Sequence, residues 1–398
     1  MTVDYDPYSD EAMRDPRELY RQMREAGCPY HLPKYNAWAL ARYDDVDQAS
    51  RAEGCIDFSK GALLGQHILG EPIPHTFMTM NEPERKPWRN VLTPFYSRKA
   101  IKEEAERLRS LVRELLHPLL AQGTFDVYRD LANRVMCINA GYNLGLPRED
   151  AEYLRSLIDE MILHRETGQK GASSERNQRA AQELGGYMAA FVARLRQQPE
   201  LAVRQAKALL EAEVEGQRLT DVDLINYFFS LLVTGSETTP MATAGVFYYL
   251  AKHPDQKALV VADPAGLAKA AFLETCRYDQ PTNMLVRSAR KDFELGGKQI
   301  RQNDVLLMIY ASANRDEARF ERAEEFDIRR PRKADLTFGT GPGYCLGANL
   351  AEFIGPLMVE EIISAIGDFE LIEDQCERAY GENLAGFNRV PIRFTPPV

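Results

Sequence analysis

The chain has 398 residues, of which 44% are hydrophobic and 27% charged, so it can bury a substantial core beneath a polar surface. Its formal net charge of −10 argues against nucleic-acid binding, because nucleic-acid phosphates would repel such a surface. The first residues are acidic and polar and lack the basic and apolar regions of a secretion signal or membrane anchor. We therefore expect a cytoplasmic protein with no membrane association. The six cysteines include no Cys-x-x-Cys pair, which excludes a common zinc or disulfide framework.

No proline-, serine- or glycine-rich linker and no internal repeat divides the chain, so we predict one domain spanning residues 1–398. Helical patterns dominate residues 45–278. Strand patterns precede and follow them, at residues 37–43, 286–295, 305–310, 369–372 and 390–394. The predicted fold is mainly α, with a minor sheet assembled from both ends of the chain.

A buried central helix is predicted to start after Thr220, because Asp223 follows three residues later and residues 224–233 are apolar nearly all round. Residues 234–240 then place hydroxyls, an acid and a proline in the middle of this helix. Pro240 cannot donate a hydrogen bond to the Ser236 carbonyl, so we expect the backbone to open locally. Glu237 and Thr238 could there supply hydrogen-bond donors and a proton route. Alternatively, the hydroxyls of this segment bond back to carbonyls one turn earlier.

A glycine-rich hairpin at residues 338–347 leads into a strongly helical stretch at residues 348–366. Glycines at 339, 341 and 343 tolerate positive φ and let a flat ligand approach the backbone. Cys345 lies where the first amides of the helix would favour a thiolate, with the amides of Leu346 and Gly347 near the sulfur. In isolation, a cysteine in such a loop is more often a buried structural thiol.

The segment from Phe338 and Gly339 to Cys345 and Gly347 resembles the haem-binding signature of the cytochromes P450, and residues 234–239 resemble that family's oxygen-activation motif. Glu274 and Arg277, followed by Pro281 and Arg287, resemble its glutamate-x-x-arginine motif. Motifs in the family's order therefore span nearly the whole chain. The resemblance implies a cytochrome P450 fold of the soluble bacterial type, with a central helix running over the haem.

The resemblance also implies site roles. Cys345 would bind the iron of haem b (iron protoporphyrin IX), with Phe338, Gly339 and Gly347 shaping its loop. Glu237 and Thr238 would be catalytic, as the proton-delivery pair. Arg85, Arg89 and Arg287 would contact the haem propionates, although a solvated basic helix face is the alternative for Arg85 and Arg89. Glu274 and Arg277 would brace the loop that carries the cysteine.

Three departures from the family pattern stand out. Gly343 occupies the position where a basic residue usually reaches a propionate, so the three arginines would have to hold the haem. Glu352 stands where an arginine is frequent, which could alter the fit of an electron donor. Gly355 and Pro356 are expected to interrupt the helix that follows the cysteine.

The predicted reaction is insertion of one atom of dioxygen into a small or medium apolar organic substrate, by hydroxylation or oxidative demethylation. Electrons would come from a separate ferredoxin or flavodoxin with its reductase. Candidate substrate contacts are Phe229, Val233, Asn283, Val286 and Phe387, with His164 as a further polar group. Alternatives are aryl coupling, desaturation or peroxygenase chemistry on the same fold, or a non-catalytic haem or recruitment protein.

Overall fold

The computed structural model describes residues 3–162 and 174–397. Its α-helices are α1 (Asp10–Arg14), α2 (Arg17–Ala26), α3 (Tyr43–Arg51), α4 (Leu64–Ile68), α5 (Arg85–Leu92), α6 (Arg98–Glu103), α7 (Ala105–Leu120), α8 (Asn133–Leu144), α9 (Ala151–Ile162), α10 (Glu175–Gln197), α11 (Arg204–Glu211), α12 (Asp221–Ser236), α13 (Thr238–Lys252), α14 (Pro254–Ala262), α15 (Pro264–Tyr278), α16 (Tyr310–Ala313) and α17 (Ala348–Ile366). A short π-helix, η4 (Val127–Ala132), precedes α8.

The strands are short and form several small sheets. They are β1 (Tyr30–Leu32), β2 (Ala37–Leu40), β3 (Ile56–Asp57), β4 (Thr124–Asp126), β5 (Glu213–Val214), β6 (Gln217–Arg218), β7 (Leu285–Ala289), β8 (Phe293–Leu295), β9 (Lys298–Ile300), β10 (Val305–Met308), β11 (Glu370–Leu371), β12 (Glu377–Arg378), β13 (Phe387–Arg389) and β14 (Pro391–Arg393). The largest sheet has the order β1-β2-β10-β7-β3. Because β2 pairs in parallel with β10, this sheet joins the two ends of the chain, which confirms the prediction.

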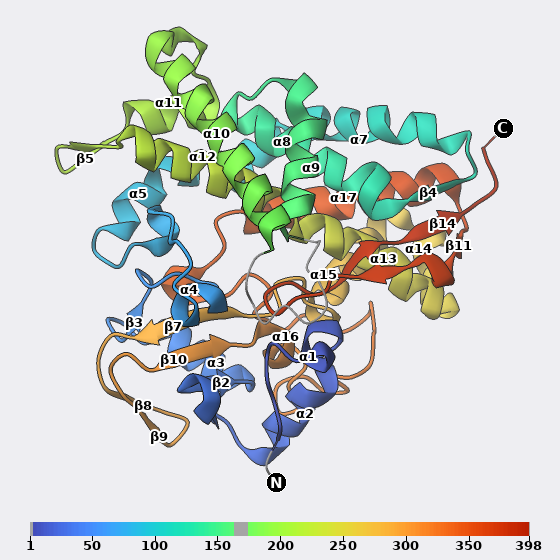
Figure 1. Ribbon diagram of the computed structural model, residues 1–398. Coiled ribbons are helices and arrows are strands. Elements are labelled where there is room, and N and C mark those ends of the chain that lie inside the picture. The colour runs from blue at the N-terminus through green and yellow to red at the C-terminus, as the bar shows by residue number, and fades with distance from the viewer. Residues whose placement is uncertain (1–2, 163–173, 398) are drawn as a thin grey trace.

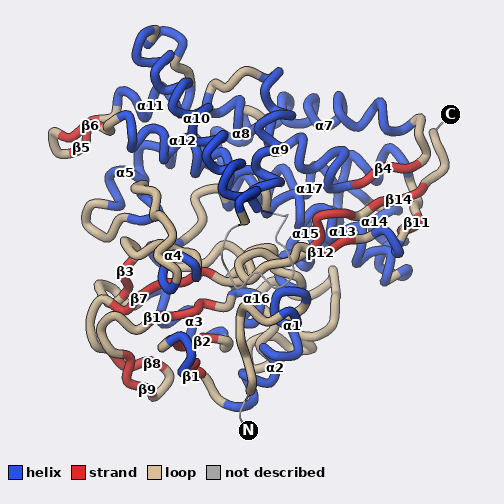
Figure 2. The backbone as a smooth tube through the Cα atoms, viewed as in Figure 1, coloured by secondary structure: helices blue, strands red, loops and turns tan. Residues whose placement is uncertain are grey.

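Helices and sheet occupy different parts of the molecule. Figure 2 shows most helices gathered on one side, with the largest sheet and the N-terminal helices on the other. In Figure 1, α17 lies beside α15 and α13 within the helical part. The mainly α fold with a minor sheet is therefore confirmed. The predicted helical stretch also contains four short strands, β3 to β6, which are too brief to leave a clear alternating pattern in the sequence.

The central helix divides at Glu237. The Thr220 side chain caps α12 by accepting from the Asp223 amide, and the Asp223 carboxylate accepts from the Thr220 amide in return. α12 ends at Ser236, and α13 starts at Thr238. Pro240 thus lies in the first turn of α13, where an amide has no intrahelical acceptor, so the missing donor costs little.

The helix after the cysteine hairpin is continuous. α17 runs from Ala348 to Ile366 with Pro356 inside it, which confirms the helical stretch predicted at residues 348–366 and shows that Pro356 does not end the helix. A Cβ atom added at Gly355 would lie 2.2 Å from a ring carbon of Phe272 on α15. Gly355 therefore serves close packing of α15 on α17.

Candidate active site

The hairpin that carries Cys345 is held by its backbone. The Cys345 amide donates to the Phe338 carbonyl at 2.9 Å, which closes the loop. Gly339 and Gly341 have φ of 69° and 61°, where glycine is favoured. A Cβ atom on Gly341 would lie only 2.5 Å from the Ser50 carbonyl oxygen of α3. Glycine at 341 is thus required both by its conformation and by its contact with α3.

Cys345 is accessible to solvent, yet it lies deep enough in the protein that burial raises the pKa of its thiol. The amides of Gly347 and Ala348 and the charge of Arg89 act in the opposite direction. Burial thus opposes the amide donors at this thiol, and the thiolate expected at Cys345 stays a prediction. The two backbone amides that interact with the sulfur are those of Gly347 and Ala348, whereas the sequence predicted those of Leu346 and Gly347. α17 begins only at Ala348. A bound cation would reverse this balance.

Two arginines are buried at one aromatic ring. Arg85, on α5, is 3% exposed and Arg287, on β7, is 7% exposed. Their guanidinium carbons lie 4.2 and 4.7 Å from the centre of the Phe58 ring. Arg89 follows one turn after Arg85 and is half-buried. Within residues 3–162 and 174–397, none of the three arginines forms an ion pair with a carboxylate.

The charges of the cationic cluster, which consists of Arg85, Arg89 and Arg287, are only weakly compensated: Glu82 acts on Arg85 and Arg89 but forms no ion pair with them in the described part of the chain. Burial, followed by the charges of Arg287 and Arg89, lowers the pKa of Arg85 to about 10. The Nε and Nη1 atoms of Arg85 have no hydrogen-bond partner in the described part of the chain. Buried cations without partners are costly unless a ligand satisfies them. The cluster thus fits a ligand that carries more than one carboxylate.

Further contacts join this cluster to the cysteine hairpin. Arg89 interacts electrostatically with Cys345, and the buried Tyr310 of α16 interacts with Arg287. The Tyr310 hydroxyl lies 3.8 Å from the position a Cβ would take on Gly339. Cluster and thiol therefore belong to one site, with contributions from α5, β7, α16 and the hairpin.

Sequence reasoning missed two members of this site, Phe58 and Tyr310, and the structure adds His67 beside them. Phe58 also lies near Gly343, at 3.7 Å from an added Cβ, so its ring faces the position that usually carries a basic residue. His67 on α4 contacts the Ser288 hydroxyl at 3.1 Å, and burial lowers its pKa, with a smaller effect from Arg287. Their position follows from tertiary packing, and no motif or spacing marks them.

Glu237, at the junction of α12 and α13, is 3% exposed. Its Oε2 accepts a hydrogen bond from the Tyr128 hydroxyl at 3.1 Å, whereas Oε1 has no partner among the described residues. Burial, with the nearby charge of Asp159, raises the pKa of Glu237 to about 8. The carboxyl group can therefore hold a proton at neutral pH.

The hydroxyls around Glu237 divide into two groups. Thr234 and Ser236 donate to the carbonyls of Ser230 and Leu232, both at 2.7 Å, as the alternative interpretation predicted for this segment. The Thr238 hydroxyl has no such bond within the described residues, and Thr238 is only partly buried. Among the described residues the Thr239 hydroxyl has no such bond either, but Thr239 is buried, so Thr238 carries the more accessible hydroxyl of the two.

Glu274 and Arg277 form a buried two-point ion pair, with nitrogen–oxygen distances of 2.7 and 2.9 Å. Arg277 also donates to the carbonyls of Asn314, Ala323 and Glu325, and Glu274 accepts from the Asp327 amide at 3.0 Å. The pair thus ties α15 to the loop that leads to the cysteine hairpin.

The candidate substrate contacts separate into two sets. Phe229 and Val233 are partly buried on α12. Asn283, Val286 and Phe387 are core residues instead, with exposures of 1%, 0% and 4%. Asn283 accepts from the Tyr20 hydroxyl and donates to the Glu382 carbonyl, while Phe387 stacks on Tyr248. For these three the predicted role as substrate contacts is corrected to a structural one. His164 lies outside the described residues.

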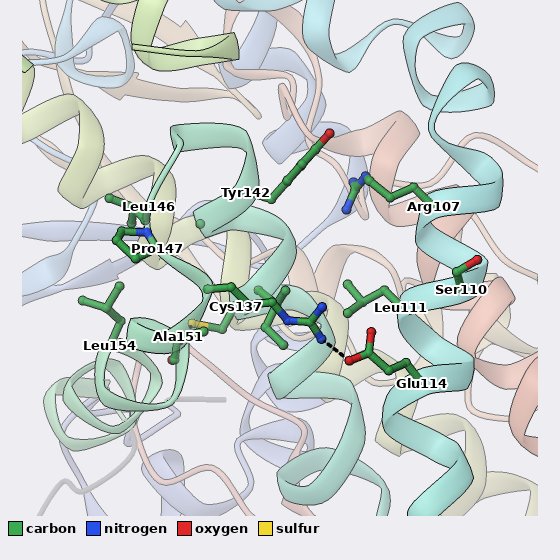
Figure 3. A pocket seen from close by; sticks show the side chains of 13 residues that line it. Arg107, Ser110, Leu111, Glu114, Cys137, Tyr142, Leu146, Pro147, Ala151 and Leu154 are labelled. Carbon is green, nitrogen blue, oxygen red and sulfur yellow. Dashed lines mark hydrogen bonds and ion pairs between the residues drawn. The ribbon is translucent and has the colours of Figure 1, made fainter. Parts of the chain in front are cut away.

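A separate cavity of about 300 Å³ lies between α7, α8 and the start of α9 (Figure 3). Leu111, Ile138 and Leu154 make much of its wall apolar, and an ion pair between Arg148 and Glu114 crosses it. Cys345 does not line this cavity. Cys137 does, and its thiol is also within electrostatic reach of Glu237, so α8 separates the cavity from the junction of α12 and α13.

Comparison with known proteins agrees with this geometry. The family model "Cytochrome P450" matches residues 266–378. The chain is 30% identical to "Putative cytochrome P450 123" of Mycobacterium tuberculosis, over 97% of this chain and 96% of that protein. It is 28% identical to "Cytochrome p450 CYP199A2" of Rhodopseudomonas palustris, over 98% and 94% of the two chains. The structure of CYP109Q5 from Chondromyces apiculatus superposes with a TM-score of 0.85, at 25% identity and full coverage of both chains.

A cysteine thiolate can hold a haem iron, and the arginines beside Cys345 could bind carboxylates of such a group. The chain belongs to the cytochrome P450 family. It is accordingly a monooxygenase with a haem-thiolate iron cofactor. No helix within the described residues is long and apolar enough to cross a membrane.

Proposed function

We propose that Cys345 ligates the iron of haem b and that Arg85, Arg89 and Arg287 hold its two propionates. The observation that carries this proposal is the cationic cluster, whose charges lack carboxylate partners in the described chain and lie beside Cys345. Two propionates would supply the missing negative charges. A bound haem-thiolate supplies the chemistry that cleaves dioxygen.

The hairpin residues would position the sulfur rather than react. Phe338 anchors the Cys345 amide, and glycine at 339 keeps the hairpin close to Tyr310. The amides of Gly347 and Ala348 point to the sulfur and would moderate its electron donation. Glu274 and Arg277 would keep the preceding loop in place.

Glu237 and Thr238 would serve as the proton-delivery pair. The raised pKa of the buried Glu237 allows it to hold a proton at neutral pH, and the Thr238 hydroxyl makes no hydrogen bond to a residue in the described part of the chain. A proton released from the Glu237 carboxyl could pass through Thr238 to oxygen that is being reduced. Replacement of either side chain would therefore slow proton supply more than substrate binding.

The substrate we propose is a small or medium apolar organic molecule, hydroxylated or oxidatively demethylated beside Phe229 and Val233. Two relatives support this class. A "Steroid C26-monooxygenase" of Mycobacterium tuberculosis is 26% identical over 97% of this chain. A 26% identical structure is a mutant of P450 EryK "in complex with erythromycin B", with a TM-score of 0.84.

Residues 1–398 would form one catalytic domain that receives electrons from a separate ferredoxin or flavodoxin with its reductase. The sheet that joins both ends of the chain supports the single domain. Glu352, which departs from the family pattern, pairs with Lys269 at 3.0 Å, so its charge is partly offset on that surface.

A ligand screen tests the substrate class. Steroids, macrolides and small charged metabolites are titrated into the ferric enzyme, and the change from low to high spin is followed by absorbance. Apolar compounds should produce the shift, and turnover with a ferredoxin system should then give a product heavier by one oxygen or lighter by a methylene. Spin shifts confined to small charged compounds would contradict the proposed class.

A further inference from the structure

The Glu237 carboxyl is surrounded by titratable groups from three other elements. Tyr128 comes from η4, Cys137 from α8, and both Asp159 and Arg155 from α9. Tyr128 donates directly to Glu237. Burial raises the pKa of Cys137 to about 12, so its thiol stays neutral and adds no charge.

Two side chains donate hydrogen bonds to the Asp159 carboxylate. Its Oδ1 accepts from the Asn133 side-chain amide at 2.8 Å, and its Oδ2 accepts from Arg155 at 2.6 Å. Donors of this kind favour the charged form of a carboxyl group. Its negative charge lies within electrostatic reach of Glu237 and opposes a second negative charge there.

Tyr128 acts in the opposite direction. Its hydroxyl is fully buried and donates to Oε2 of Glu237, which stabilises the ionised carboxylate. Asp159 thus favours the protonated form of Glu237, whereas Tyr128 favours the ionised form. The two residues come from separate segments of the chain.

We propose that Asp159 and Tyr128 are positioning residues that set the proton occupancy of Glu237. Asp159 keeps Glu237 protonated between turnovers and drives its reprotonation, while Tyr128 stabilises the carboxylate enough for the proton to leave. This inference rests on the proposed proton-delivery role of Glu237.

The proton balance is simple. The O–H bond of Glu237 breaks, its electron pair stays on the carboxylate, and the proton moves to oxygen that is reduced by electrons from the redox partner. The resulting carboxylate faces the charge of Asp159, so it takes one proton from solvent and the O–H bond forms again. Glu237 gains and loses no electrons.

Infrared titration of the ferric holoenzyme tests this inference. The carboxylic acid band of Glu237 is assigned as the band that disappears in Glu237→Gln, and its midpoint is measured against pH. We expect a midpoint near pH 8 in the wild type. Asp159→Asn should lower this midpoint by about one unit or more, because it removes the opposing charge. Tyr128→Phe should raise it.

The chain offers a matched control pair. Tyr187 donates to Asp150 at 2.6 Å, another tyrosine–carboxylate bond, and neither residue is among the groups that act on Glu237. Tyr187→Phe and Asp150→Asn should leave the Glu237 midpoint unchanged. An unchanged midpoint in both test variants, or shifts in the same direction, would overturn the inference.

If Asp159→Asn fails to fold, Tyr128→Phe decides the outcome alone, since only the proposed balance predicts an upward shift. The ferrous carbon-monoxide spectrum of each variant separates this inference from the proposed function. If the wild type shows the thiolate spectrum but the Glu237 midpoint does not move in the variants, only the inference is refuted. If the wild type lacks the thiolate spectrum, the proposed haem ligation is refuted.

Discussion

At the scale of single residues, the buried positive charges of the cationic cluster lower the folding stability of the haem-free protein, and an anionic ligand would offset this effect. Arg85 and Arg287 are buried, share the Phe58 ring and repel one another. Arg277 is equally buried but fully paired with Glu274. The two kinds of buried arginine should therefore respond in opposite ways to substitution.

Arg85→Met should weaken haem retention while stabilising the haem-free protein by about 1–3 kcal/mol, because an unsatisfied buried cation is removed. Arg277→Met, the matched control, should destabilise both forms by about 3–5 kcal/mol, since Glu274 loses its two-point partner and keeps only the ion pair with Arg330, while three backbone carbonyls lose their donor. Denaturant unfolding of haem-free and haem-loaded protein measures both effects. Equal destabilisation by Arg85→Met in the two forms would contradict the assignment.

Glu237 makes stability depend on pH. Its folded pKa of about 8 lies above the unfolded value of roughly 4.3, so stability falls as pH rises from about 4.3 through 8. Glutamine does not ionise, so the stability of Glu237→Gln should not fall in this way. At pH 8 its free energy of unfolding should exceed that of the wild type by on the order of a few kcal/mol, and at pH 4 the two should be nearly equal. Urea unfolding across this range measures the difference. Parallel pH curves for the two proteins would refute the raised pKa, and Glu114→Gln, at an exposed ion pair, serves as the control.

At the scale of elements, α17 holds the cysteine hairpin because it packs tightly on α15. Gly355→Ala places a methyl group against the Phe272 ring and should cost about 1–3 kcal/mol. Gly185 on α10 has open space around it, so Gly185→Ala should be neutral or stabilising by up to about 1 kcal/mol. Thermal unfolding measures both.

A smaller ring partner should relieve the Gly355→Ala strain. In a double-mutant cycle, the combined Gly355→Ala and Phe272→Leu protein should lose less stability than the sum of the single changes. Strict additivity would show that the two residues do not compete for the same space.

Elements with strong local signals could be predicted from the sequence. The cap at Thr220, the apolar run of α12 and the proline after Glu237 locate the divided central helix, because each acts within a few residues. The extent of α17 could also be predicted, whereas its close packing on α15 could not, since Gly355 and Phe272 are distant in the chain. Phe58 and Tyr310 were missed for the same reason.

Asn283 shows the reverse error. Its position in the family pattern and its polar side chain suggested a substrate contact, yet Tyr20 and the Glu382 carbonyl bind the oxygen and the nitrogen of its side-chain amide. Burial and hydrogen-bond satisfaction are properties of the folded chain, and a single sequence carries no direct signal of them.

At the scale of the whole molecule, the site draws on segments far apart in the chain. Arg85 and Arg89 come from α5, Arg287 from the sheet that joins both ends, and Cys345 from the hairpin before α17. A ligand bound to all of them would tie the helical part to the sheet. Haem binding should therefore raise the stability of the whole fold.

Removal of the haem should lower the melting temperature and change its response to salt. In the haem-free protein, sulfate should screen or bind the cationic cluster and raise the melting temperature more than in the haem-loaded protein, where carboxylates already occupy it. Calorimetry of both forms in sulfate and in chloride measures this difference. The same response in both forms would argue against an anionic ligand at the cluster.

The ferrous carbon-monoxide difference spectrum tests the central claim, ligation of haem iron by Cys345, most directly. The wild type should show the red-shifted Soret band of thiolate ligation, and Cys345→Ala should lose that band, whereas Cys376→Ala, at another free cysteine, should keep it. A wild-type spectrum without the red-shifted band, or a Cys345→Ala spectrum that retains it, would contradict the account.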